Sequence, residues 1–228
     1  MLNALKESAK NSLNPNSYAY NLLRWMYGSI AGKPRVRYLG KRALTMLVRK
    51  DSRFEESELC MAGGCPMKVL DAVIGKWKPH SFLDIGCGTG KTLEYVAAKG
   101  IECVGLEGSQ PAIESSPVKG LIVRADLNKP VRLERTFDLV WSYEVAEHIH
   151  PKFVEIFLET LTGHGDLIAI SAARPGQGGA GHFNEQPPQY WIDRIERRGF
   201  TYQREFTEYL HGLNDGWSHN MMVFVRPR

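Results

Sequence analysis

The sequence feature that most constrains the fold is the run Phe82-Leu-Asp-Ile-Gly-Cys-Gly-Thr-Gly90. Its apolar start predicts a buried strand, and the residues from Lys91 onward have the pattern of a helix. Three alternating glycines between a strand and a helix let the backbone approach a ligand closely, with helix N–H groups facing it. The run therefore predicts a ligand-binding turn in an α/β domain.

The rest of the chain after this run repeats the rhythm of strand and helix. Strands are expected over 81–85, 101–106, 120–124, 137–142, 167–171, 200–210 and 221–225, and helices over 68–77, 91–99, 111–115, 144–148, 152–161 and 189–198. Alternation of this kind predicts a parallel sheet with helices on both faces. The last two strands have no helix between them in this prediction, which indicates an antiparallel hairpin at one edge.

Acidic residues follow the predicted strands at positions suited to a nucleotide-like ligand. Asp84 comes just before the first glycine, where it can meet a positively charged group. Glu107 ends the second strand and can accept hydrogen bonds from both hydroxyls of a ribose. Asp126 follows the third strand, at a position from which it can contact the edge of an adenine. A dinucleotide fingerprint would need a glycine at position 91, where the chain has Lys91.

Together with Arg124-Ala-Asp-Leu127 and Phe137-Asp-Leu-Val140, this pattern resembles the class I S-adenosylmethionine-dependent methyltransferases over about residues 68–228. The resemblance implies a seven-stranded, doubly wound sheet of order 3-2-1-4-5-7-6 with strand 7 antiparallel. It also implies S-adenosyl-L-methionine as cofactor. The cofactor-binding residues would be Asp84, Gly86, Cys87, Gly88, Glu107, Gly108, Asp126, Leu127 and Ser142. A dehydrogenase-like nucleotide domain is the alternative.

The predicted acceptor side carries ionisable groups in two loops. Glu144, Glu147 and His148 stand at helical spacing, so one helical turn would bring them to one face. A glycine-rich loop, 174–186, adds His182, with Asn184 and Glu185 nearby. Glu144, His148 and His182 are the candidate catalytic residues. The alternative is that Glu144 complements a helix dipole and His148 is a packed, non-reacting group.

The E-x-x-E-H pattern is similar to that of ubiquinone-pathway O-methyltransferases. It also resembles the small-RNA 3′-terminal 2′-O-methyltransferases, in which both Glu and two His hold a divalent ion. That resemblance implies a metal site of Glu144, Glu147, His148 and His182, suited by ligand type to Mn²⁺, Fe²⁺ or Zn²⁺, with Mg²⁺ held more weakly. The glycine-rich loop resembles that of bacterial methyltransferases associated with sugars and surface glycans. Trp217, in the segment that joins the last two predicted strands, could stack on a sugar ring, although packing of the strand ends is the preferred interpretation.

Charge is distributed unevenly along the chain. Residues 1–80 carry a net charge of +8 and residues 81–228 one of −4. The excess is densest at 24–53, interleaved with aromatic residues, which indicates either an anionic partner or a solvated helix pair. We expect a basic helical extension at 1–67 and a catalytic domain at 68–228. Without a signal-peptide pattern or a spanning segment, a cytoplasmic location is expected, with peripheral membrane contact left open.

Three functions remain open at this point. The first is an O-methyltransferase for a hydroxyl of a sugar or glycoconjugate. Its acceptor would be a small molecule or a glycan, and in one version of the hypothesis the acceptor carries a phosphate or another anion. The second is an RNA 2′-O-methyltransferase, which ranks lower because the basic segment lacks a nucleic-acid motif. The third is a regulatory protein that binds S-adenosylmethionine without catalysis.

Overall fold

The computed structural model describes residues 64–179 and 181–227. These residues form a seven-stranded sheet of order β3-β2-β1-β4-β5-β7-β6, which confirms the predicted order. Strands β1 to β5 pair in parallel, and β7 is antiparallel to both β5 and β6. The strands are β1 (Ser81–Ile85), β2 (Glu102–Glu107), β3 (Ile122–Arg124), β4 (Leu139–Ser142), β5 (Leu167–Ser171), β6 (Thr201–Tyr202) and β7 (Met221–Val225).

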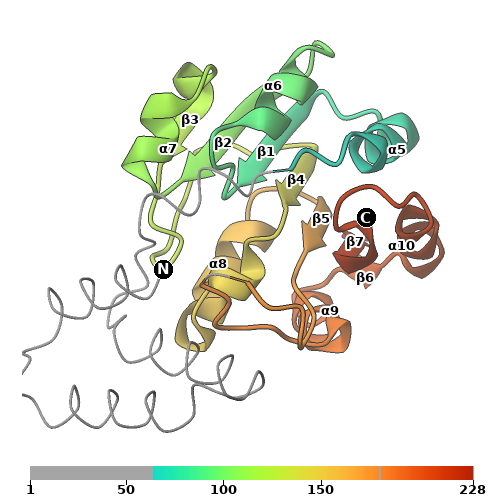
Figure 1. Cartoon of the computed structure of the whole chain (residues 1–228). Helices are drawn as coiled ribbons and strands as arrows, with labels where there is room; N and C mark the ends of the chain where they lie inside the picture. The colour runs from blue at the N-terminus through green and yellow to red at the C-terminus, as the bar shows by residue number, and fades with distance from the viewer. Residues whose placement is uncertain (1–63, 180, 228) are drawn as a thin grey trace, which may run out of the picture. The chain divides into compact units, whose positions relative to one another are not determined.

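Helices cover both faces of this sheet (Figure 1). Alternate residues of β1 enter different cores: Phe82 packs with one side and Leu83 with the other, as expected of a strand buried on both faces. One core receives α8 (Val154–Thr162) and α9 (Pro188–Glu196). The other receives α5 (Met67–Trp77), α6 (Lys91–Ala97) and α10 (Arg204–His211). The short α7 (Gln110–Ser115) follows β2.

The prediction of one long strand over 200–210 was wrong. Only Thr201–Tyr202 pairs with β7, and Arg204–His211 forms α10. Aromatic and β-branched residues in this segment favour a strand, but Thr207 and Leu210 are buried at helical spacing. The Thr207 hydroxyl also accepts a hydrogen bond from the Val223 N–H at 3.2 Å, so the helix is tied to β7. The antiparallel edge is therefore present, with a helix inside its connection.

Smaller differences concern the ends of two strands. Residues Lys119–Leu121 form a 3-10 turn before β3, and β4 begins at Leu139. None of the helices in 64–179 and 181–227 is long and apolar enough to cross a bilayer. The expected helices and the basic stretch before residue 64 lie outside the described residues, so the boundary at 67/68 stays a prediction.

We predict that Gly105→Ala destabilises the fold and disturbs the glycine turn. A Cβ at Gly105, in the middle of β2, would lie 2.6 Å from both Cys87 Sγ and Leu93 Cδ1. Because Leu93 is fully buried, relief requires movement of α6 or of the turn. The free energy of unfolding, measured by urea denaturation, should fall by about 1–3 kcal/mol.

Gly120→Ala is the matched control, because a Cβ at Gly120 meets no atom within 4 Å. Its free energy of unfolding should stay within about 0.5 kcal/mol of wild type. Equal stability of the two variants would contradict the close approach of β2 to the turn.

Candidate active site

The candidate site lies along the edge where the parallel strands end. The register of β1 with β2 and of β4 with β5 brings the last residues of these strands side by side. The loops after them therefore gather at one edge, which is where open α/β sheets bind ligands. Every predicted site residue lies at the end of one of the strands β1 to β4, in the loop that follows such a strand, or in the loop 174–186.

The glycine turn after β1 has the backbone geometry that only glycine tolerates well. Gly86, Gly88 and Gly90 have φ angles of +82°, +56° and +78°. A Cβ at Gly86 would lie 2.5 Å from the Val145 side chain, in the loop after β4. The N–H groups of Gly86 and Cys87 both donate to the Leu106 carbonyl, at 2.8 and 3.1 Å. The turn is thus fixed between β2 and β4.

Glu107 fastens the turn from the end of β2. One carboxylate oxygen accepts the Gly88 N–H at 2.8 Å, and the other accepts the Ser109 N–H at 2.7 Å. Each carboxylate oxygen can accept more than one hydrogen bond. The carboxylate can therefore hold the turn and still receive two ribose hydroxyls, which is the role predicted for it.

Asp84 is buried at the end of β1, with 3% of its surface exposed. Burial raises the pKa of its carboxyl to about 8, and the nearby charge of Glu107 adds to the rise. A carboxyl in this state gains most from a cationic ligand, because a positive charge favours the ionised form. This fits the predicted place beside the methionine moiety of the cofactor.

The remaining predicted cofactor residues border the same edge. The Ser142 hydroxyl donates to the Ile85 carbonyl at 2.9 Å, which ties the end of β4 to the end of β1. A Cβ at Gly108 would lie 3.2 Å from the Ala125 carbonyl oxygen, so the loops after β2 and β3 run close together. Asp126 in the second loop accepts the Asn128 N–H at 3.1 Å, and the next residue, Leu127, packs against the core.

Glu144 is bound by two side-chain amides and is not among the potential ligands that converge. The expected helix over 144–148 does not form: Glu144 has a φ of +53°, and only Ala146–His148 makes a 3-10 turn. The Glu144 carboxylate instead accepts hydrogen bonds from Gln177 Nε2 and Asn220 Nδ2, both at 3.0 Å. Its N–H donates to the Ser171 hydroxyl at 2.7 Å. Sequence spacing did not reveal this amide cradle, because Asn220 is distant along the chain.

Glu147, His148 and His182 do converge. One potential ligand atom from each lies within 4.8 Å of the others. Glu147 is fully buried, and neither carboxylate oxygen has a hydrogen-bond partner of normal geometry. Burial, and then the charge of Glu144, raise the pKa of Glu147 well above its usual value, although backbone N–H groups at Glu147 and Ala173 oppose this. The 3-10 turn positions Glu147 and His148, and the glycine-rich loop positions His182 near them.

The Nδ1 atom of each imidazole is bound, so the orientation of each ring is fixed. His148 Nδ1 lies 3.1 Å from the Gly181 carbonyl oxygen, which can only accept, so Nδ1 carries the proton. His182 Nδ1 lies 3.1 Å from a Glu185 carboxylate oxygen. In the neutral form of both rings the lone pair is then on Nε2, the atom that can bind a metal or accept a proton.

Glu185 organises the glycine-rich loop as well as His182. Its two carboxylate oxygens accept the N–H groups of Gly176 and Gly178 at 2.9 and 2.7 Å, and its side chain is 2% exposed. A Cβ at Gly179 would lie 2.3 Å from His182 Nε2, so the loop needs glycine there. Sequence reasoning named Glu185 only as an available side chain; an acid three residues after His182 was the signal for its role.

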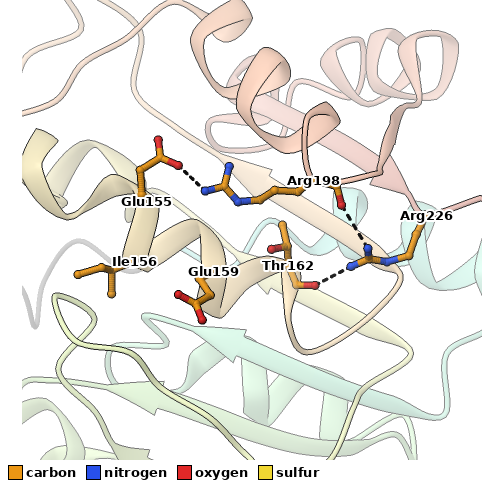
Figure 2. A pocket seen from close by; sticks show the side chains of 6 residues that line it. All are labelled: Glu155, Ile156, Glu159, Thr162, Arg198 and Arg226. Atoms are coloured by element: carbon orange, nitrogen blue, oxygen red, sulfur yellow. Dashed lines mark hydrogen bonds and ion pairs between the residues drawn. The ribbon is translucent and has the colours of Figure 1, made fainter.

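A surface depression elsewhere has a different character (Figure 2). It has a volume of about 480 Å³ and is lined by Glu155, Ile156, Glu159, Thr162, Arg198 and Arg226. Arg198 pairs with Glu155, and Arg226 donates to the carbonyls of Thr162 and Arg198. Arg226 follows β7, so the depression lies at the opposite edge of the sheet from the predicted site, and its arginines are already paired.

Known proteins match this domain in sequence. Residues 83–168 match the family model of the methyltransferase domain. Over 109 residues the chain is 31% identical to norajmaline N-methyltransferase of Rauvolfia serpentina, covering 42% of this chain and 37% of that protein. Over 107 residues it is 33% identical to the chloroplastic tocopherol O-methyltransferase of Arabidopsis thaliana, covering 41% and 30%. The chain thus spans about a third of the length of these curated relatives.

Solved structures share the fold. An amino pentose methyltransferase from Micromonospora echinaspora, involved in calicheamicin biosynthesis, superposes with a TM-score of 0.58 at 14% identity, over 74% of this chain and 94% of that one. The methyltransferase domain of bacterial CtHen1-C gives 0.54 at 17%, over 72% and 98%. Residues 83–168 therefore match a methyltransferase domain, and the described residues have the class I fold of these solved structures. This confirms the resemblance and the fold inferred from the sequence.

We predict an unusual pH dependence of stability from Asp84. Its folded pKa of about 8 lies above the unfolded value of 3.8, so the folded state keeps a proton that the unfolded state has lost. Stability of the ligand-free protein should therefore fall as pH rises from about 4 to 8. Asp84→Asn removes this loss, so its melting temperature relative to wild type should increase between pH 4.5 and 8.5.

Asp138→Asn is the control with the opposite sign. Hydrogen bonds, first from the His80 N–H, lower the pKa of Asp138, so its stabilisation is present at neutral pH and is lost as pH falls. This variant should be less stable than wild type at pH 8.5 and approach it in acid. If the stability of Asp84→Asn relative to wild type also fell as pH rises, the raised pKa of Asp84 would be refuted.

Proposed function

We propose that the chain is an S-adenosylmethionine-dependent O-methyltransferase that acts on a hydroxyl of a sugar or glycoconjugate. The observation that carries the proposal is the buried Glu147 with the imidazoles of His148 and His182, at the same sheet edge as the glycine turn. A hydroxyl acceptor must lose its proton as the methyl group is transferred. An amine acceptor can attack as the free base and needs no such cluster, which favours oxygen over nitrogen.

In this proposal the cofactor lies across the ends of β1 and β4. Asp84 faces its cationic methionine end, Glu107 receives the ribose hydroxyls, and Asp126 with Leu127 borders the adenine. Ser142 would close the methionine end, and the cofactor would supply the methyl group to an acceptor held near the loop after β4. Rate comes mainly from holding the acceptor oxygen in line with the sulfonium carbon. The glycine-rich loop, held by Glu185, covers this position and limits the entry of water.

The cluster fits a divalent cation. Two buried carboxylate oxygens that lack a hydrogen bond of normal geometry, and two imidazoles with bound Nδ1 atoms, form a donor set suited to Mn²⁺, Fe²⁺ or Zn²⁺. A bound ion would lower the pKa of the acceptor hydroxyl. The Glu185 carboxylate on His182 Nδ1 is the kind of outer partner that orients a metal-binding histidine. Glu144 would join only if Gln177 and Asn220 released its carboxylate.

Without a metal, the same geometry supports a histidine base. His182 is then the better candidate, because Glu185 stabilises the imidazolium that forms when the ring takes up the acceptor proton. The two versions share residues but differ in their response to chelation.

Two other functions remain as alternatives. RNA 2′-O-methylation would draw on the basic stretch 24–53, which lies outside the described residues, and on the likeness to bacterial CtHen1-C. A non-catalytic, S-adenosylmethionine-binding regulator is the third alternative; its weakness is the cost of burying the Glu147 carboxyl without a hydrogen bond of normal geometry. We also infer a cytoplasmic location, which the free thiols of Cys65, Cys87 and Cys103 support.

The test is transfer of a labelled methyl group from S-adenosylmethionine by the full chain, with sugars, lipids and RNA as acceptors. We expect transfer to a sugar acceptor, loss of activity in chelator and recovery with Mn²⁺. Glu147→Gln should lower the rate by at least about 100-fold, and Glu185→Gln should weaken metal affinity about 10–100-fold. Glu159→Gln, in the distant depression, is the matched control and should leave both unchanged.

Each alternative has its own outcome in this assay. Transfer to RNA alone would replace the sugar hypothesis. Full activity in chelator, with no metal by elemental analysis, would refute the metal and leave the histidine base. Binding of the cofactor with transfer to no acceptor would favour the regulatory function.

A further inference from the structure

A tryptophan is exposed at the acceptor edge of the sheet. Trp217 lies in the turn between α10 and β7, and it is 46% exposed, whereas Trp141 and Trp191 are fully buried. Because β7 begins opposite Ser171, at the end of β5, this turn opens on the same edge as the candidate active site. The preferred interpretation from sequence, that Trp217 simply packs the strand ends, does not account for so much exposed indole.

The turn that carries Trp217 is firmly held. The Trp217 N–H donates to the Tyr143 hydroxyl at 2.7 Å, and the Tyr143 ring stacks on Trp141 beneath it. Gly216 has a φ of +54° and lies close to the same hydroxyl, because a Cβ at Gly216 would be 2.5 Å from the Tyr143 oxygen. An Asp215 carboxylate oxygen accepts the Lys68 N–H at 2.7 Å, which ties the turn to α5. An exposed aromatic on a rigid backbone loses little entropy on binding a ligand.

A cation contacts the same turn. Arg174 follows β5, and its guanidinium donates to the carbonyl of His219, whose ring lies edge-on to Trp217 with centroids 5.5 Å apart. Within 64–179 and 181–227, no carboxylate forms an ion pair with Arg174. The nearby carboxylates of Glu144 and Asp215 are occupied by N–H donors. The positive charge of Arg174 is therefore available to a ligand.

The same residues are continuous with the candidate active site. Asn220, next to His219 in sequence, donates to Glu144 at 3.0 Å and to the Gln177 side-chain oxygen at 2.8 Å. The Gln177 N–H in turn donates to the Arg174 carbonyl at 3.0 Å. This polar network leads from Arg174 to Glu144, whose charge acts on Glu147. A ligand on Trp217 would thus reach toward the reacting edge.

We propose that Trp217 and Arg174 form an acceptor subsite for a sugar ring that carries an anionic group, a carboxylate or a phosphate. The ring would stack on the exposed indole face, and the guanidinium would bind the anion by charge-assisted hydrogen bonds. The inference rests on the proposed function for its place in the reaction, but the binding itself requires no methyl transfer.

The experiment uses the full chain labelled with 5-fluorotryptophan and followed by ¹⁹F NMR. The chain has five tryptophans, so Trp217→Phe assigns the resonance. The probes are glucuronate, glucose 6-phosphate, glucose and inorganic phosphate. We expect the Trp217 resonance to shift with the two charged sugars at lower concentrations than with glucose. Arg174→Gln should weaken binding of both charged sugars about tenfold or more and leave glucose unchanged.

Arg204→Gln is the matched control, because Arg204 faces Tyr202 at the β6 edge and should not affect any probe. A Trp217 resonance that none of the sugars shifts would overturn the subsite. A shift by inorganic phosphate equal to that by glucose 6-phosphate would show an anion site without a sugar platform, and would overturn the sugar part. Because the readout needs no cofactor or turnover, failure of the proposed methyl transfer would leave these results standing, and the two ideas can fail separately.

Discussion

The structure depends on the parallel pairing of β1 with β2 and β4. Parallel strands must end at the same edge, so this pairing sets the glycine turn beside Glu107 and Ser142. The conformation of the turn is then fixed, because the Leu106 carbonyl accepts two of its N–H groups and the Glu107 carboxylate accepts a third. A cofactor site formed in this way belongs to the rigid centre of the sheet, while the acceptor loops at β5 and β7 can differ without disturbing it.

Two buried acids give this edge its chemistry. Asp84 lies in β1 and Glu147 in the loop after β4, and burial, with a nearby acidic charge, raises the carboxyl pKa of each. Burying a carboxylate without a partner is costly unless a cation compensates it. The edge therefore has two buried acids that a positive charge would stabilise; in the proposed function these charges are the cofactor's methionine end and a divalent ion or an imidazolium. Glu185 adds precision at the second place by fixing His182.

Local patterns predicted the cofactor half of the molecule and much less of the acceptor half. A strand followed by spaced glycines and an acid at the next strand's end depends on neighbours in sequence, so Asp84 and Glu107 do lie at the predicted edge of the sheet, and their roles toward a cofactor stay predictions. The amide cradle of Glu144 was not predictable, because Gln177 and Asn220 reach it only through the fold. The same holds for α10, where the aromatic residues suggested a strand and tertiary packing of Leu210 selected a helix.

The most direct test of this account is calorimetric titration of S-adenosylmethionine and, separately, of a nicotinamide dinucleotide into the full chain. We expect S-adenosylmethionine to bind more tightly, and Glu107→Ala to weaken this binding by roughly 1.5–3 kcal/mol in a protein that circular dichroism shows to be folded. Tighter binding of the dinucleotide, or full affinity in the Glu107 variant, would contradict it.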